Sequence, residues 1–128
     1  MTTWERLRAA RLVGVVRDRD GDRAESVARG LADGGLRAVE ITANTPHATR
    51  SLRALAARYG QVAWGLGTVR DPDDVDRAAD AGASFVVSPH FDPRVVERAL
   101  AFGLVFFFDD TATTEIYAAH AAGAPVVK

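Results

Sequence analysis

The sequence predicts an α/β fold, a (β/α)8 TIM barrel that is truncated after about the sixth strand. Short apolar runs alternate with amphipathic segments, and the expected strands begin near residues 12, 37, 62, 84, 104 and 125. This alternation is typical of parallel strands joined by crossover helices. A doubly wound sheet is the alternative, but the uniform spacing and the lack of a GxGxxG turn after the first strand favour the barrel.

Length and composition narrow the protein class. A closed eight-stranded barrel needs at least about 200 residues, whereas this chain has 128. Its 16 basic and 17 acidic residues nearly cancel, so we expect a small-molecule partner, no nucleic acid and no membrane. The absence of cysteine excludes disulfides and a thiol nucleophile. Without a signal peptide or a long apolar run, the chain is expected to be cytoplasmic.

The first half of the chain contains three expected helices. Residues 3–11 predict a short helix that would cap the barrel floor, followed by a strand over residues 12–16. In the next helix, over residues 22–33, an apolar stripe is expected from Ala24, Val27, Ala28 and Leu31. Gly34 and Gly35 end this helix before the strand that carries Glu40. A third helix is expected over residues 46–59, with Pro46 in its first turn.

The second half repeats the pattern. Asp71-Pro72 and Asp92-Pro93 are typical of helix starts, because aspartate caps the first turn and proline fits its first position. The second of these helices is expected to turn Val95, Val96, Ala99 and Leu100 inward. A last helix is expected over residues 113–122, and a strand over residues 125–128 would end the chain.

The C-terminal ends of parallel strands converge on one face, where barrel enzymes carry their chemistry. The expected rim comprises Arg17, Glu40 with Thr42, Gly67 with Thr68, Ser88 with Pro89, Asp109 and Lys128. Glu40 is the first catalytic candidate, because burial in a strand normally excludes a carboxylate; a surface ion pair is the alternative. Lys128 follows a buried apolar strand, and desolvation favours the neutral, nucleophilic amine of a lysine. A frayed, solvated chain end is the alternative for Lys128.

An ordered set of motifs resembles a known family. The runs are VVR (15–17), GGLRAVEIT (34–42), GLGTV (65–69), GASFVVSPH (82–90), TEI (114–116) and GAPVVK (123–128). Together they resemble the 2-keto-3-deoxy-6-phosphogluconate (KDPG) and 4-hydroxy-2-oxoglutarate aldolases. The resemblance covers essentially all of residues 1–128, which we interpret as a single partial aldolase barrel domain, an N-terminal fragment of such an enzyme.

The resemblance implies a class I aldolase, a carbon–carbon lyase that cleaves a 2-keto-4-hydroxy acid into pyruvate and an aldehyde, as in Entner–Doudoroff carbohydrate metabolism. Lys128 matches the Schiff-base lysine and Glu40 the general acid/base. Thr68 and Pro89 match positions that line the pyruvate site, and Arg17 fits a carboxylate clamp. Ser88 and Asn44 complete the expected substrate-binding set, although some members have arginine at the position of Asn44. A homotrimer is implied for the complete protein.

No cofactor and no metal are expected. The three histidines, His47, His90 and His120, lie on different predicted units without a ligand spacing, so a metal-dependent aldolase is unsupported. Two alternatives to the class I aldolase remain: another phosphate-binding barrel isomerase or synthase, which would use Glu40 as a base without an imine at Lys128, and an inactive fragment.

One stretch departs from the family pattern. Members have a Pro-Gly turn and a threonine-rich segment after the fifth strand, where this chain has Phe106-Phe107-Phe108-Asp109-Asp110 followed by DTATTEIY (110–117). This last run matches one reading frame of a common sequencing-library adapter. We therefore hypothesise that residues 106–117 are partly artefactual.

Overall fold

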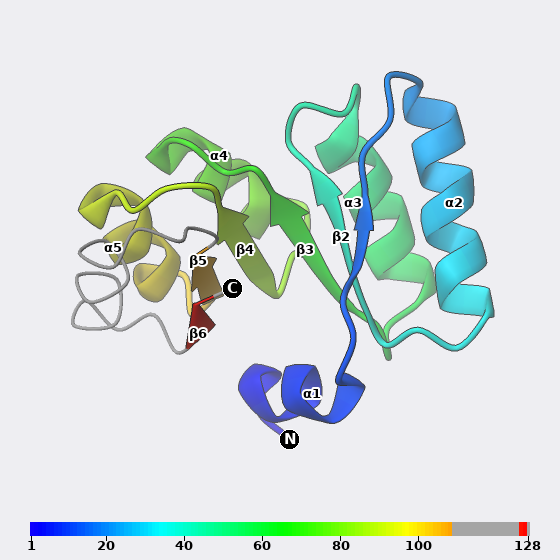
Figure 1. Cartoon of the computed structure of the whole chain (residues 1–128), viewed down its shortest axis with the longest axis horizontal. Helices are drawn as coiled ribbons and strands as arrows, with labels where there is room; N and C mark the ends of the chain where they lie inside the picture. The colour runs from blue at the N-terminus through cyan, green and yellow to red at the C-terminus, as the bar shows by residue number, and fades with distance from the viewer. Residues whose placement is uncertain (109–125, 128) are drawn as a thin grey trace.

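The computed structural model describes residues 1–108 and the backbone of residues 126–127. Five helices and six strands alternate along this part of the chain (Figure 1). Their bounds are α1 Thr3–Ala10, β1 Gly14–Val16, α2 Gly21–Asp33, β2 Ala38–Thr42, α3 Ala48–Arg58, β3 Ala63–Gly67, α4 Pro72–Asp80, β4 Phe85–Ser88, α5 Pro93–Ala101, β5 Val105–Phe108 and β6 Val126–Val127.

The strands form one parallel sheet in the order β1-β2-β3-β4-β5-β6. Each strand begins one or two residues after the predicted position. Sequential neighbours that pair in parallel are the arrangement of a (β/α) barrel, whereas a doubly wound sheet reverses its strand order. The predicted fold class is thus confirmed for six strands, and the predicted helix over residues 113–122 lies outside the described residues.

The two faces of the sheet bury different side chains. The outer face packs large apolar residues such as Ile41, Trp64 and Phe106 against the helices. On the inner face, Ala38, Ala63, Phe85 and Val87 form a smaller cluster with Leu7 of α1. Helix α1 lies below the N-terminal ends of the strands (Figure 1), so it covers the floor of the interior as the sequence predicted.

Helix ends follow the predicted capping chemistry. The side chain of Asp71 accepts a hydrogen bond from the backbone N–H of Asp74 at 2.9 Å, and Asp92 accepts from the N–H of Arg94 at the same distance. Each aspartate satisfies an N–H that a helix start leaves unpaired.

Every helix in the described part of the chain is too short or too polar to span a bilayer.

The predicted start of α3 is wrong by two residues. Pro46 lies in a turn before the helix, and His47 adopts a left-handed backbone with φ 59°. The N–H of Ala48 donates to the carbonyl of Thr45, which closes that turn. Regular helical geometry therefore begins only at Ala48, because a left-handed residue cannot sit inside an α-helix.

Two residues that the apolar stripes placed inside are exposed. Val27 is 47% exposed and Leu100 is 52% exposed. Helix α2 instead buries a line of small residues, Ala24, Ala28 and Ala32. At 3.6 residues per turn, Val27 lies about a quarter turn from the centre of this line, and Leu100 has the same relation to the buried face of α5.

Gly65 has no room for a side chain in the interior. A Cβ at this position would overlap the ring of Phe85, which covers the glycine from the neighbouring strand. We predict that Gly65→Ala lowers the free energy of unfolding by about 1–3 kcal/mol, because an overpacked core must shift. Urea-induced unfolding measures this change.

The matched control is Gly30→Ala on α2, where an added Cβ has no atom within 4 Å. This change should raise the free energy of unfolding by about 0.5–1 kcal/mol, because alanine favours the helix over glycine. Equal effects of the two substitutions would contradict the packing described for Gly65.

Candidate functional site

Glu40 is a buried carboxylate in the middle of the sheet. It lies on β2, only 4% exposed, and pairs in the ladder with Val15 of β1 and Gly65 of β3. A Cβ added at Gly67 would overlap the Oε1 atom of Glu40. The carboxylate therefore occupies the space above β3 that any side chain at position 67 would need.

This carboxylate faces the interior of the curved sheet. A cavity of about 290 Å³ there is lined by Glu40, by Arg11 from the end of α1, and by apolar side chains that include Val15, Phe85 and Phe107. Electrostatic interactions are stronger beside apolar walls than in water. Glu40, the central residue of β2, is thus placed where a carboxylate could act on a ligand bound in the interior.

Arg17 and Thr68 meet at the rim. The guanidinium Nη2 of Arg17, just after β1, donates to the hydroxyl of Thr68 at 2.8 Å. Thr68 directly follows Gly67 and has a left-handed backbone with φ 56°. Such a backbone is strained for a β-branched residue, and strain of this kind concentrates at functional sites. A chain of contacts therefore links Glu40, Gly67, Thr68 and Arg17.

Backbone hydrogen bonds on both sides hold Thr68 in this conformation. The N–H of Ala43 donates to the carbonyl of Gly67 at 2.8 Å, and the N–H of Val69 donates to that of Val87 at 2.9 Å. The strained turn is consequently fixed between β2 and β4.

A buried pair of threonines joins the first two rim loops. The hydroxyls of Thr42 and Thr45 lie 2.9 Å apart, and Thr45 accepts from the backbone N–H of Asp18 at 3.3 Å. Asp18 in turn binds Arg23 through both carboxylate oxygens, each at 2.7 Å. These hydrogen bonds from Arg23 hold the pKa of Asp18 well below its usual range. The loop that carries Arg17 is therefore anchored on β2.

Ser88 and Pro89 lie at the end of β4. The Ser88 hydroxyl is fully buried, 2.6 Å from the carbonyl oxygen of Val69 and 2.9 Å from that of His90. Its single proton can be donated to either carbonyl. Ser88 thus ties the loop after β3 to the loop after β4, beside Pro89.

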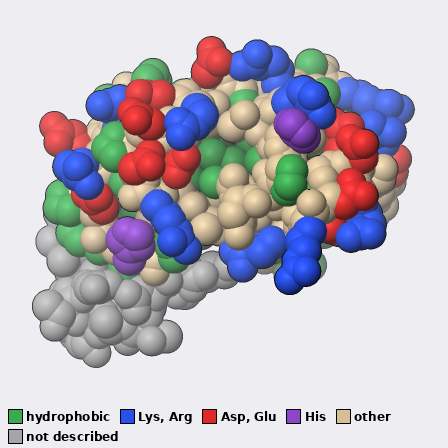
Figure 2. Space-filling model, turned by 90° about the horizontal axis from the view of Figure 1, so that it is seen from above, with side chains coloured by type: hydrophobic (Ala, Val, Ile, Leu, Met, Phe, Trp, Pro, Cys, Tyr) green, Lys and Arg blue, Asp and Glu red, His purple; other side chains and the backbone are tan. Residues whose placement is uncertain are grey.

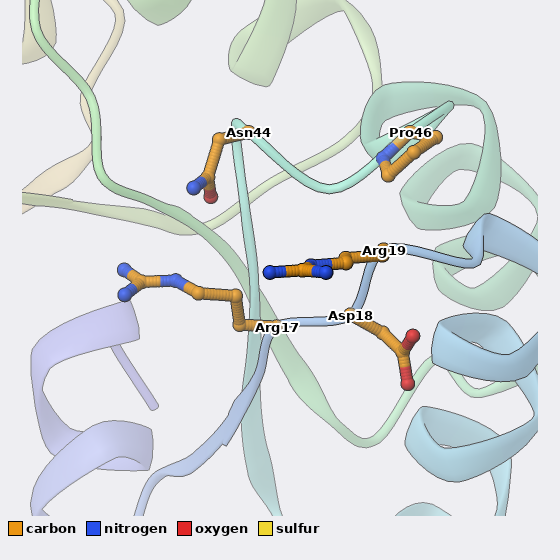
Figure 3. Close-up of a pocket in the computed structure, with 5 residues that line it drawn as sticks. All are labelled: Arg17, Asp18, Arg19, Asn44 and Pro46. Carbon is orange, nitrogen blue, oxygen red and sulfur yellow. The ribbon is translucent and has the colours of Figure 1, made fainter.

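A polar hollow lies on the rim outside β1 and β2. We call it the rim hollow; its volume is about 620 Å³, and it is lined by Arg17, Asp18, Arg19, Asn44 and Pro46. Figure 3 shows Arg17 and Arg19 extending toward the same side, with the amide of Asn44 facing them and Asp18 turned away. The structure therefore groups two predicted residues, Arg17 and Asn44, with three that the predicted binding set did not include, Asp18, Arg19 and Pro46.

Charged side chains surround this end of the molecule. Figure 2 looks down on the C-terminal ends of the strands and shows acidic and basic groups around the periphery, with uncharged and apolar atoms nearer the centre.

Within residues 1–108, no group of three His, Cys, Asp or Glu side chains could hold a metal ion. His47 and His90 are exposed. Lys128, Asp109 and His120 lie outside the described residues.

The sequence pattern placed Gly67 on the rim without indicating its contact with Glu40, and it did not single out Arg19 or Gly65. Arg19 falls in a polar loop whose side-chain directions no periodicity fixes. The two glycines carried a signal, because alternate glycines in a strand indicate close approach by another group. Their spacing of two residues places both on the face that Glu40 uses.

Comparisons with known proteins agree with this geometry. A family model described as "Aldolase: KDPG and KHG aldolase" matches residues 4–128. The chain is 37% identical over 128 residues to a 2-dehydro-3-deoxy-phosphogluconate aldolase of Treponema pallidum, covering all of this chain and 61% of that protein. It is 33% identical over 118 residues to a 2-dehydro-3-deoxy-6-phosphogalactonate aldolase of Escherichia coli, covering 91% and 58%.

A solved structure shows the same fold. The crystal structure of a 4-hydroxy-2-oxoglutarate/2-dehydro-3-deoxyphosphogluconate aldolase from TTHB1 superposes with a TM-score of 0.80 and 34% identity. The superposition covers 96% of this chain and 60% of that one. The chain thus spans about three fifths of the length of these relatives. On the family match and these identities, the chain belongs to the KDPG and KHG aldolase family.

Proposed function

We propose that the protein is a class I aldolase that cleaves a 2-keto-4-hydroxy acid through an imine. The observation that carries this proposal is the buried carboxylate of Glu40, which lies against Gly67 on the inner face of the sheet. A buried carboxylate beside apolar walls is suited to general acid/base catalysis, because its surroundings can adjust its proton affinity. The names of the relatives, which are aldolases of 2-keto-3-deoxy-6-phospho sugar acids and of 4-hydroxy-2-oxoglutarate, support the same reaction class.

Lys128 is the proposed covalent residue. The ladder aligns Val126 of β6 with Phe107 of β5, whose ring packs in the inner cluster. Lys128 directly follows β6 in the sequence and matches the Schiff-base lysine that the resemblance implies.

The proposed reaction proceeds in balanced steps. The Lys128 amine attacks the C2 ketone, and loss of water from the resulting carbinolamine leaves a cationic imine. Glu40 transfers the protons of this dehydration and then accepts the proton of the C4 hydroxyl. As the C4 carbonyl forms, the C3–C4 bond breaks and its electron pair moves into the imine to give an enamine. Protonation at C3 and hydrolysis release pyruvate and restore the amine.

The rim residues are proposed to bind the keto acid. Arg17 would hold the carboxylate, because a guanidinium presents paired donors. Thr68 and Pro89 would line the pyruvate portion, and Asn44 would add an amide donor from the rim hollow. For Ser88 we propose a supporting contribution, since its hydroxyl fixes the loop that carries Pro89.

The substrate class follows from the relatives. We propose a 2-keto-3-deoxy-6-phospho sugar acid or 4-hydroxy-2-oxoglutarate, with pyruvate and an aldehyde such as glyceraldehyde 3-phosphate as products. A cytoplasmic location and a homotrimeric complete protein belong to the same proposal. No cofactor is required, because the imine itself supplies the electron sink.

Imine trapping tests the covalent step. Incubating the 128-residue chain with pyruvate and borohydride should add the mass of one reduced pyruvate, and peptide mapping should place it on Lys128. Lys128→Ala should abolish the adduct, because the attacking amine is gone. A phosphate-binding isomerase or synthase would give no adduct, so failure of the parent to react would contradict the class I aldolase.

Glu40→Gln tests the proton transfer. Glutamine preserves the size of the side chain but removes its acid/base function, so the rate of imine formation should fall by about 10²- to 10⁴-fold. The pyruvate concentration that gives half-maximal trapping should change little. Quenched time courses with borohydride separate the rate from the affinity.

Glu97→Gln is the control, because Glu97 is exposed on α5 and its substitution removes the same charge. Its rate should match the parent. If Glu40→Gln also reacted at the parent rate, Glu40 would have a structural role and the proposed acid/base assignment would be wrong.

A further inference from the structure

We propose that Arg19 is a ligand-binding residue that completes, with Arg17 and Asn44, a binding site for the carboxylate of a 2-keto acid in the rim hollow. This inference deepens the proposed function and rests on it for the identity of the ligand. The site would then contain two guanidinium groups, those of Arg17 and Arg19, whereas the sequence indicated only Arg17 as a carboxylate clamp.

The geometry brings three donor groups to one place. Arg17 and Arg19 come from the loop after β1, and Asn44 comes from the loop after β2. In Figure 3, the guanidinium of Arg19 lies between the backbone of its own loop and the strand-end loop that carries Asn44, on the same side as Arg17. The cavity of about 620 Å³ is large enough for a small organic acid.

The charges in the hollow are not balanced by its own acidic residue. Asp18 turns away, and both of its carboxylate oxygens bind Arg23. Asp20 caps α2 by accepting from the N–H groups of Asp22 and Arg23. Neither aspartate is therefore available to neutralise the hollow.

The two arginines retain donors for a ligand. Arg17 uses one nitrogen on the neutral hydroxyl of Thr68. Within residues 1–108, the guanidinium of Arg19 makes no hydrogen bond or ion pair. Two guanidinium groups and a carboxamide all present N–H donors, and a carboxylate accepts through both oxygens. An anion is thus the complementary ligand.

The hollow is also connected to the proposed chemistry. Arg17 contacts Thr68, Thr68 follows Gly67, and Gly67 lies against the carboxylate of Glu40. The hollow therefore borders the turn that packs against the Glu40 carboxylate. Arg19 would touch the ligand itself rather than act through another residue.

Pyruvate is the probe for the test. We expect Arg19→Gln to raise the pyruvate concentration for half-maximal borohydride trapping by about tenfold, because a charge-assisted hydrogen bond is lost. The maximal trapping rate should stay near that of the parent. Arg19→Lys should recover part of the loss, since it restores the charge without the paired donors.

Arg50→Gln is the matched control. Arg50 lies in a neighbouring hollow that Arg19 also borders, but it does not line the rim hollow. Removing this exposed charge should change the half-maximal concentration by less than about twofold. Arg19 is exposed as well, so its variants should keep the parent circular dichroism spectrum and melting temperature.

A second measurement separates this inference from the aldolase proposal. Titration of the Lys128→Ala chain with pyruvate, followed by NMR at the side-chain amide of Asn44, reports binding without the imine. Weaker binding after Arg19→Gln supports the inference even if the parent traps no pyruvate, in which case the aldolase proposal fails alone. Trapping and titration curves that are unchanged by Arg19→Gln would overturn the role of Arg19 and leave the aldolase proposal standing.

Discussion

The geometry of the site rests on two glycines of β3, which leave room for side chains from the strands on either side. Gly65 lies under the ring of Phe85, and Gly67 lies under the carboxylate of Glu40. Because side chains alternate along a strand, both glycines leave space on the same inner face. A side chain at position 65 would displace the ring of Phe85, and one at position 67 would displace the carboxylate of Glu40. The packing of the sheet around these glycines thus holds the buried carboxylate in one position.

Contacts between successive loops hold the rim at the C-terminal ends of the strands. Thr68 receives the hydrogen bond of Arg17, and the buried Thr42–Thr45 pair anchors the backbone of Asp18. Ser88 joins the next two loops through the carbonyls of Val69 and His90. Most of these groups are buried or hydrogen-bonded to backbone, so they hold the loops in fixed geometry. The Arg17–Thr68 hydrogen bond therefore connects the rim hollow to the strained turn after β3.

The sequence predicted the strands, the capped helices and the depth of Glu40 because each depends on local spacing and residue type. The helix stripes were less reliable: Val27 and Leu100 are apolar, yet they lie at the edges of buried faces that alanine and valine fill. The start of α3 was misplaced because Pro46 fits a turn as readily as a helix. Arg19 could not be predicted, since no periodicity fixes side-chain directions in the loop after β1, and Asn44, which lines the same hollow, comes from a different loop.

Gly67 leaves the space that the Glu40 carboxylate occupies, and a double-mutant cycle measures this dependence. Urea unfolding of the parent, Gly67→Ala, Glu40→Ala and the double variant gives the coupling free energy. We predict that Gly67→Ala costs at least about 1 kcal/mol more stability in the parent than in the Glu40→Ala background, because the two groups overlap only while the carboxylate is present. Additive effects of the two substitutions would contradict the account.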